Sequence, residues 1–176
     1  MSVAYLGLGS NQGNRSMHLR AAVEGLAAVD PVTVTAGSSV YETEAHTVGP
    51  DEEQPRFLNA VVEAEVTCAP ETLLRVAKRL EREAGRDVDE ERWAPRPLDV
   101  DLLVVGDMTR RTDDLTLPHP RLGERRFVLR PWADLAPNLV VPPPFEATVQ
   151  ALLNGCSDAA AIRKTRHSLG VEEGGR

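Results

Sequence analysis

The sequence predicts an α+β fold, a ferredoxin-like sandwich with a mostly antiparallel sheet and helices packed on its faces. Two observations lead to this prediction. In the first two-thirds of the chain, segments with strand and helix periodicity follow in the order strand, helix, strand, strand, helix, strand. The 176 residues are 41% hydrophobic and 27% charged, which suits one soluble domain with its own core. We therefore expect a single domain over 1–156 and a polar tail over 157–176 that is partly disordered.

The N-terminal elements follow from apolar periodicity and turn residues. The apolar run over 3–8 predicts a buried strand, and the Gly and Asn content of 9–13 predicts a turn. Apolar residues then recur with helical spacing, and either Asn14 or Ser16 is a suitable N-cap. β-Branched residues over 32–41 predict the second strand.

A second strand–helix–strand unit follows a polar loop over 42–56. Alternating apolar residues over 57–66 predict a strand. A helix is predicted to begin with Pro70 in its first turn and to end at Gly85, and a charged loop leads to an apolar strand over 98–105. Beyond it, the pattern predicts an extended stretch over 115–118, a proline-rich turn over 118–120, and a short helix over 149–153.

Charge and composition exclude several classes of function. The net charge of −7 argues against nonspecific nucleic-acid binding, so a phosphate site would need a local arginine cluster. Cys68 and Cys156 lack metal-ligand spacing and fit a reducing compartment. No apolar stretch approaches the roughly 20 residues of a membrane span, and the chain begins without a targeting segment. We expect a cytoplasmic protein that binds neither membranes nor nucleic acid; nothing in the sequence requires an oligomer, so we expect a monomer.

The most informative residues are Asp99 and Asp101 within the last apolar strand. Positions i and i+2 of a strand point to the same face, so the two carboxylates project together. Adjacent carboxylates repel one another and need compensation. Divalent cations supply it, because Mg²⁺ binds carboxylate oxygens and usually completes its shell with water and substrate phosphates. A solvated sheet face, or pairing with arginines, is an equally good explanation for the two aspartates alone; Arg96, held between Pro95 and Pro97, favours a metal–nucleotide site.

Around these residues the chain strongly resembles the 6-hydroxymethyl-7,8-dihydropterin pyrophosphokinase family. The motif from Arg92 to Leu103 matches that family throughout. Further matches occur in the family's order, at 9–11, 57–60, 85–86, 117–121 and 125–129. The resemblance covers about residues 3–153. It implies an enzyme that transfers the pyrophosphoryl group of ATP to the hydroxymethyl group of a reduced pterin, giving AMP and the pterin diphosphate in folate biosynthesis.

The resemblance also implies a role for each matched position. Asp99 and Asp101 would hold two Mg²⁺ ions that bridge the ATP phosphates, with Arg86 and Arg96 as the other catalytic residues. ATP would be contacted by Glu81, Arg86, Arg96, Leu102, Thr116, His119 and Arg125. The pterin would be bound by Thr43, Phe57, Asn59, Trp93 and Phe127.

The residue types suit this chemistry independently of the resemblance. A pterin is flat and needs aromatic stacking, worth about 0.5–1.5 kcal/mol beyond its buried area. Its polar edge needs an amide that both donates and accepts, which Asn59 supplies. Each residue also has a purely structural explanation: the phenylalanines as core residues, His119 as part of a turn, Trp93 as a loop anchor. The residues at 9–11 fit a structural turn better than a phosphate loop.

Some positions depart from the family's pattern. The segment over 87–91 is acidic where a basic residue is frequent, and the loop after Thr43 lacks the usual prolines. Two other functions remain open on the residues alone. A nucleotidyltransferase or cyclase could use the same carboxylate pair but would release pyrophosphate rather than AMP. A non-catalytic ATP- or pterin-binding module would bind without turnover.

Overall fold

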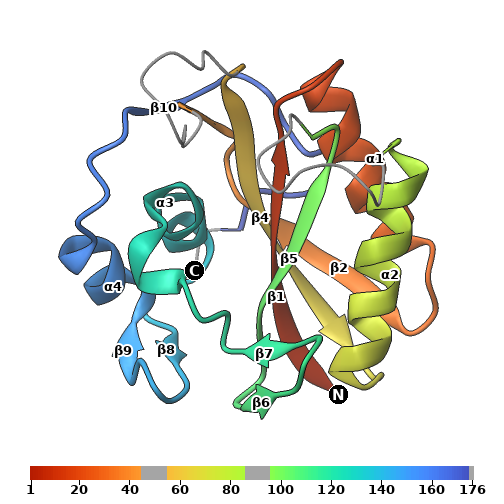
Figure 1. Ribbon diagram of the computed structural model, residues 1–176. Coiled ribbons are helices and arrows are strands. Elements are labelled where there is room, and N and C mark those ends of the chain that lie inside the picture. The colour runs from red at the N-terminus through yellow and green to blue at the C-terminus, as the bar shows by residue number, and fades with distance from the viewer. Residues whose placement is uncertain (45–54, 86–95, 175–176) are drawn as a thin grey trace.

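The computed structural model describes residues 1–44, 55–85 and 96–174. Its centre is a six-stranded sheet in the order β10-β3-β4-β1-β5, with β2 paired to the same edge of β4 as β3. Every pairing in this sheet is antiparallel. The α+β fold with a mostly antiparallel sheet and helices on its faces is therefore confirmed (Figure 1).

The elements follow the predicted order through the fifth strand. The strands of the main sheet are β1 (Ser2–Ser10), β2 (Val32–Gly37), β3 (Tyr41–Thr43), β4 (Phe57–Val66), β5 (Asp99–Val105) and β10 (Ile162–Lys164). The helices are α1 (Arg15–Ala27), α2 (Pro70–Glu83), the 3₁₀ helix η1 (Leu122–Glu124), α3 (Arg126–Leu135) and α4 (Val149–Gly155). Two small hairpins complete the chain, β6 (Arg110–Arg111) with β7 (Thr116–Leu117), and β8 (Val140–Val141) with β9 (Ala147–Thr148).

Helices cover the sheet on both faces. In Figure 1, α1 and α2 lie on one side of the strands, and α3 and α4 lie on the other. Alternation along β1 feeds both cores: Leu6 and Leu8 pack with the residues of α1 and α2, whereas Tyr5 packs against Trp132 of α3. Because both faces of its centre are covered, β1 is buried on both sides from Ala4 to Ser10.

The predicted helix boundaries are confirmed by the capping residues. The Asn14 side chain accepts a hydrogen bond from the backbone N–H of Met17, so Asn14 caps α1. Pro70 occupies the first turn of α2. After α2, Gly85 adopts φ +96°, a left-handed conformation that favours glycine at a helix end.

Two predicted strand boundaries were wrong. Strand β1 continues to Ser10 rather than ending at a turn that begins with Gly9, because Gly9 pairs with Asn59 on one side and Asp99 on the other. The predicted strand over 32–41 is interrupted after Gly37. There the Ser38 hydroxyl replaces a ladder partner by accepting from the Val61 N–H at 2.8 Å. These pairings depend on strands that are distant in the sequence, and local propensity carries no information about them.

The expectation of a partly disordered tail is corrected for the described residues up to 174. Strand β10 pairs with β3, Leu169 is buried in the core, and Gly37 bridges to Glu173. Strand β10 lies at the edge of the sheet, where the side chains of Arg163 and Lys164 are exposed. As for membranes, no helix within the described part of the chain has both the length and the apolarity needed to cross one.

Candidate active site

A cavity of about 270 Å³ opens between the sheet and α3. It exists because β1 carries glycines on this face: a Cβ added at Gly9 would lie 3.1 Å from Asn59 Oδ1. Its lining comes from β1, β3, β4, β5, η1 and α3 together with their flanking residues. The main polar and aromatic lining residues are Thr43, Phe57, Asn59, Arg96, Asp99, Asp101, Arg121, Glu124, Arg125 and Phe127. The site therefore joins residues far apart in the sequence.

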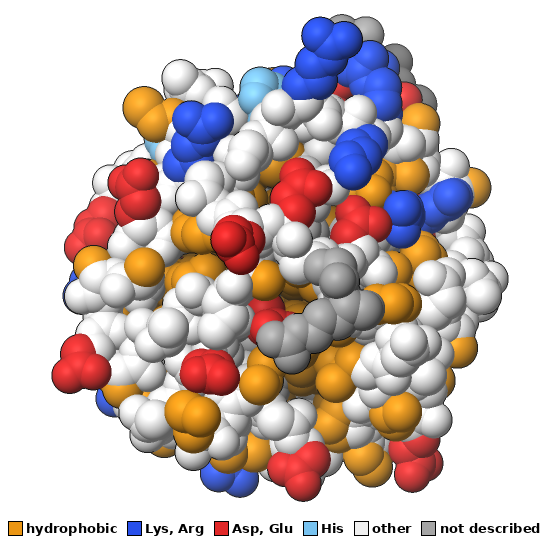
Figure 2. Space-filling view, turned by 180° about the vertical axis from the view of Figure 1, so that it is seen from behind, with side chains coloured by type: hydrophobic (Ala, Val, Ile, Leu, Met, Phe, Trp, Pro, Cys, Tyr) orange, Lys and Arg blue, Asp and Glu red, His pale blue; other side chains and the backbone are white. Residues whose placement is uncertain are grey.

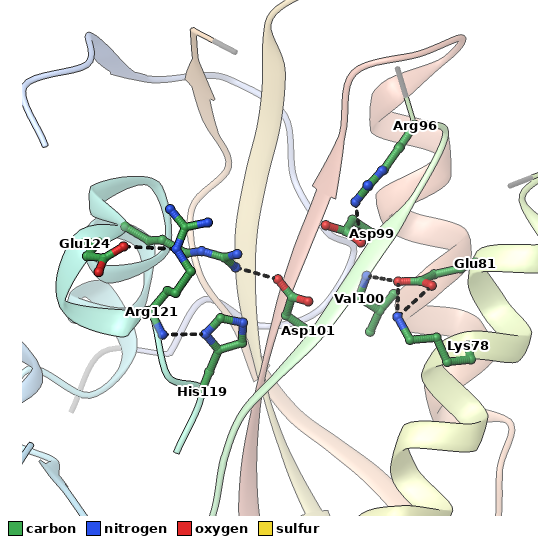
Figure 3. A network of polar contacts seen from close by, with 10 residues as sticks. Lys78, Glu81, Arg96, Asp99, Val100, Asp101, His119, Arg121 and Glu124 are labelled. Atoms are coloured by element: carbon green, nitrogen blue, oxygen red, sulfur yellow. Dashed lines mark hydrogen bonds and ion pairs between the residues drawn. The ribbon is translucent and has the colours of Figure 1, made fainter. Parts of the chain in front are cut away.

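Asp99 and Asp101 project from β5 into this cavity, as their spacing predicts. Val100 between them is buried in the opposite core, while the two carboxylate side chains are 28% and 29% exposed. Each carboxylate faces a guanidinium group. Arg96 lies 3.6 Å from Asp99 (Figure 3). Arg125 donates to Asp101 at 2.9 Å. Arginine pairing and a metal site are therefore compatible, because the same guanidinium groups could also turn to phosphate oxygens.

The donor set at β5 fits a hard divalent cation. Two carboxylates on one strand face supply the oxygen ligands that Mg²⁺ prefers. Within the ranges that the structure describes, no group of three or more His, Cys, Asp or Glu side chains forms a closed metal cage. A cation at Asp99 and Asp101 would therefore take its remaining ligands from water and substrate, which is the usual arrangement for Mg²⁺ with phosphates.

Basic groups gather beside the carboxylates despite the acidic composition. Arg96, Arg121 and Arg125 all line the cavity. On the face seen in Figure 2, Lys and Arg side chains concentrate toward the upper edge, whereas Asp and Glu are spread over the rest. The three cavity arginines provide the local cluster that a phosphate site requires in a chain of net charge −7.

His119 lies beside the carboxylate pair in a neutral form. Its backbone N–H donates to Leu103 O of β5, which brings the ring next to Asp101 (Figure 3). Burial, followed by the nearby Arg125 charge, lowers the pKa of His119 below its usual range. Its Nδ1 accepts from the Arg121 N–H at 3.1 Å, so the ring proton resides on Nε2. His119 is therefore a hydrogen-bond donor through Nε2 at neutral pH.

The same cavity also has aromatic and amide lining, and the Arg125 guanidinium lies over the Phe127 ring, 5.8 Å from its centroid. Phe57 opens β4 and Phe127 lies in the first turn of α3, so their rings reach the cavity from two different layers. Asn59 Nδ2 donates to Thr43 Oγ1 at 2.7 Å, and both side chains are at least 94% buried. A buried amide that is fixed by a neighbouring hydroxyl presents its remaining polar atoms in a defined direction.

The structure separates the predicted site residues into three groups. Arg96, Asp99, Asp101, Arg125, Thr43, Phe57, Asn59 and Phe127 line one cavity, with His119 adjacent to it. Glu81, Leu102 and Thr116 are not among its lining residues. Arg86 and Trp93 lie outside the described residues.

Glu81 instead holds α2 against β5. Its side chain is 2% exposed, and Oε1 accepts from the Val100 N–H at 2.9 Å while Lys78 Nζ lies 3.0 Å from Oε2. Burial is the largest cause that raises the pKa of Glu81, and the Asp99 charge adds to it. Glu81 therefore fixes the strand between Asp99 and Asp101 from the opposite face of the sheet (Figure 3). Leu102 packs in that same core.

Several cavity residues were not predicted. Gly7 and Gly9 alternate along β1 and leave room for the cavity, and Arg121 and Glu124 line it from η1. The alternation of two glycines in an otherwise apolar strand is a signal that could have revealed the first pair. Arg121 lies in the matched motif at 117–121, but the motif alone did not give it a role, because its position in the cavity depends on how η1 packs.

One cavity that holds two carboxylates, three arginines and two phenylalanine side chains, on an antiparallel α+β sheet, fits a phosphotransferase for a small aromatic substrate. Comparison with known proteins specifies the family. The model of the 7,8-dihydro-6-hydroxymethylpterin-pyrophosphokinase (HPPK) family matches residues 5–137. The chain belongs to this family.

Individual relatives agree with the family match. The chain is 39% identical to 2-amino-4-hydroxy-6-hydroxymethyldihydropteridine pyrophosphokinase of Bacillus subtilis over 98% of this chain and 95% of the relative. It is 43% identical to the protein of the same name from Methylorubrum extorquens over 80% of this chain and 87% of that relative. Its fold resembles a Plasmodium falciparum HPPK-DHPS crystal structure, with TM-score 0.62 and 14% identity over 88% of this chain but 43% of that one. That solved chain is thus more than twice as long as the matched region.

Proposed function

We propose that this protein transfers the pyrophosphoryl group of ATP to the hydroxymethyl group of 6-hydroxymethyl-7,8-dihydropterin, giving AMP and the pterin diphosphate for folate biosynthesis. One observation carries the proposal: a single cavity joins a carboxylate–arginine cluster to an aromatic recess with a buried amide. Family membership and the names of the relatives support the same reaction. An acceptor with a flat polar ring would fit the phenylalanines and the amide, and a triphosphate would fit the carboxylates and arginines.

The pterin would lie between Phe57 and Phe127. Stacking on two rings contributes about 0.5–1.5 kcal/mol for each aromatic pair beyond the buried area. Asn59 would read the hydrogen-bonding edge of the ring, and Thr43 holds the amide in place through the 2.7 Å hydrogen bond. Trp93, which lies outside the described residues, remains a proposed contact on the basis of the family resemblance. The hydroxymethyl group would then point toward β5, where the charged groups lie.

The triphosphate would lie across Asp99 and Asp101 among the guanidinium groups. We propose two Mg²⁺ ions there, which when bound would neutralise phosphate charge and fix the nucleotide against the two carboxylates. Arg96 and Arg125 would exchange their carboxylate partners for phosphate oxygens, and His119 would donate from Nε2. Arg86 is a further proposed phosphate contact. Of the remaining predicted ATP contacts, Glu81 would act through β5, whereas Leu102 and Thr116 would lie nearest the nucleoside.

The chemical step is an in-line displacement at the β-phosphorus. The hydroxymethyl oxygen forms a bond to that phosphorus while the bond to the oxygen of the α-phosphate breaks, so that AMP leaves and the alcohol loses its proton. The side chains in the cavity would contribute by orienting both substrates and by placing positive charge where negative charge develops. We further propose that the enzyme acts as a cytoplasmic monomer.

The direct test is to identify the nucleotide product. Incubation with ATP, MgCl₂ and 6-hydroxymethyl-7,8-dihydropterin should yield AMP and the pterin diphosphate in equal amounts, and chelation of the metal should stop the reaction. Release of pyrophosphate would indicate a nucleotidyltransferase instead. Binding of both substrates without AMP formation would indicate a non-catalytic binding module.

A further inference from the structure

The C-terminal segment over 157–174 contacts two elements beside the proposed pterin site: α3, which carries Phe127, and β3, which carries Thr43. It lies outside the matched family region, which ends at residue 137. In Figure 1 the blue chain leaves α4, passes beside α3 and reaches β10 at the outer edge of the sheet. We propose that this segment, called here the C-terminal strap, is a positioning element that sets the affinity for the pterin. The inference rests on the proposed function.

The first contact of the strap is with the helix that carries Phe127. Helix α3 begins without a capping side chain of its own. Asp158 Oδ2 accepts from the Arg126 N–H at 3.3 Å, and its Oδ1 accepts from the Ala160 N–H at 3.0 Å. A carboxylate at a helix N-terminus satisfies a free N–H group and is favoured by the helix dipole. Asp158 therefore fixes the first turn of α3, one residue before Phe127.

The second contact is with the strand that carries Thr43. Strand β3 has only three residues, and β10 pairs with all of them, with Ile162 opposite Thr43. Thr165 continues the attachment, because its backbone N–H and its hydroxyl each donate to Val40 O at 2.9 Å. A three-residue strand paired on one side alone would be a weakly held edge. With β10 in place it is an interior strand.

An ion cluster on the outer face of β3 reinforces this pairing. Glu42 accepts from Arg15 at 3.0 Å and from Arg163 of β10 at 2.9 Å, and Arg56 lies 3.7 Å away. The Glu42 side chain is 14% exposed. Hydrogen bonds from Arg15 and Arg163 outweigh its burial and lower the pKa of Glu42. The strap thus contributes one of the charges that hold the residue next to Thr43.

Strand β3 and helix α3 also contact each other directly, so the strap is a second connection between them. Tyr41 of β3 donates to Asp134 Oδ2 of α3 at 2.9 Å, and Arg130 lies over the Tyr41 ring. This contact fixes the two elements near the C-terminal end of α3. Asp158 and β10 fix the opposite end, where Phe127 and Thr43 face the cavity. Loosening the strap would therefore change the separation of the stacking ring from the amide pair while leaving β5 untouched.

The experiment compares matched strap variants of the full-length protein. Asp158→Ala removes the cap on α3, whereas Asp158→Asn keeps a side-chain acceptor. Arg163→Pro removes a backbone donor from β10 and disfavours its pairing, whereas Arg163→Ala removes only the side chain. Equilibrium dissociation constants are measured for the pterin and for the non-hydrolysable ATP analogue α,β-methylene-ATP with Mg²⁺, together with KM, kcat and thermal unfolding.

The alanine variant at Asp158 and the proline variant at Arg163 should weaken pterin binding about three- to tenfold. Nucleotide binding should weaken less, because Arg125 also lies at the start of α3 whereas the carboxylates Asp99 and Asp101 lie on β5. Asp158→Asn should stay close to wild type. Arg163→Ala should weaken pterin binding by less than about twofold, because the Arg163 side chain is 74% exposed and its ion pair with Glu42 contributes little. Unchanged pterin binding in a folded Asp158→Ala, or an equal loss of both ligands, would overturn the inference. If Arg163→Pro fails to fold, the Asp158 pair decides. A wild-type protein that binds no pterin would refute the proposed function itself, which separates the two failures.

Discussion

The Arg125–Asp101 pair allows a quantitative test of the charged groups in the site. Without substrates, Arg125 donates to Asp101 at 2.9 Å, and the two side chains are 20% and 29% exposed. A hydrogen bond between charged groups contributes about 1.5–3 kcal/mol, and partial exposure places this one toward the lower value. A cation that binds Asp101 in the absence of nucleotide competes with this interaction and is repelled by the Arg125 charge.

Replacement of Arg125 with Ala should therefore have two opposite effects. The affinity for Mg²⁺ alone should rise by about tenfold, because about 1.4 kcal/mol corresponds to a factor of ten. Turnover should fall by about 10²–10³, because a group that neutralises charge on the transferred phosphoryl is lost. Isothermal titration with MgCl₂ measures the first effect, and AMP formation at saturating ATP and pterin measures the second.

Arg121→Ala is the matched control. Arg121 lines the same cavity but pairs with Glu124 at 3.0 Å rather than with Asp101. Arg121→Ala removes the same formal charge as Arg125→Ala but leaves the Asp101 contact intact. It should therefore change the Mg²⁺ affinity by less than about threefold. Two results would refute the assignment of Asp101 as a metal ligand for which Arg125 competes: equal Mg²⁺ affinities in Arg125→Ala and wild type, or equal changes in Mg²⁺ affinity in the two arginine variants.

Three further predictions concern the strand and loop that position the charged groups. Asp99→Asn should reduce AMP formation by about 10²–10³ with an unchanged melting temperature, since the side chain is partly exposed; normal turnover would exclude it as a metal ligand. Asn11→Ala removes the Oδ1 that accepts from the Arg96 N–H at 2.6 Å and should raise KM for ATP about tenfold, whereas Asn11→Asp should not; equal KM values in the two variants would contradict this role. Glu81→Gln keeps an acceptor for the Val100 N–H and removes a buried charge whose pKa is raised mainly by burial. Because the pKa is raised in the folded state, the protonated carboxyl of the wild type favours folding at low pH, and this contribution is lost as the pH rises through the folded-state pKa. The urea midpoint of Glu81→Gln should therefore rise relative to that of the wild type from about pH 4.5 toward neutrality. A difference in urea midpoint that does not change with pH would show that burial does not control the protonation of Glu81.

Local sequence was sufficient for the strands and helices that form the scaffold. The apolar alternation over 57–66 placed Leu58, Ala60 and Val62 on one buried face, and all three lie in the core beneath α1 and α2. Helix α2 followed from Pro70 at its start and from a glycine after its end. These features depend on interactions within a few residues, which is why they could be read without the fold.

The site was predicted in part because one of its signals is local and the others are not. Two aspartates at i and i+2 must share a face of any strand, so their joint projection followed from the sequence. Their assignment to one cavity with Phe57 and Arg125 needed the family resemblance, because spacing alone does not bring β4, β5 and α3 together. Glu81 shows the opposite case: a carboxylate expected near the nucleotide is buried against Val100, and only the packing of α2 reveals this.

The sequence by itself determined the alternating pattern of β5, the paired carboxylates and the supply of arginines, because strand geometry and charge are properties of neighbouring residues. The tertiary structure decided that Gly9 lies between Asn59 and Asp99 and so opens the cavity. It also decided that Arg125 faces Asp101 and that the C-terminal strap joins β3 to α3. These depend on strand register and helix packing, which are set by contacts between distant segments that no local pattern encodes.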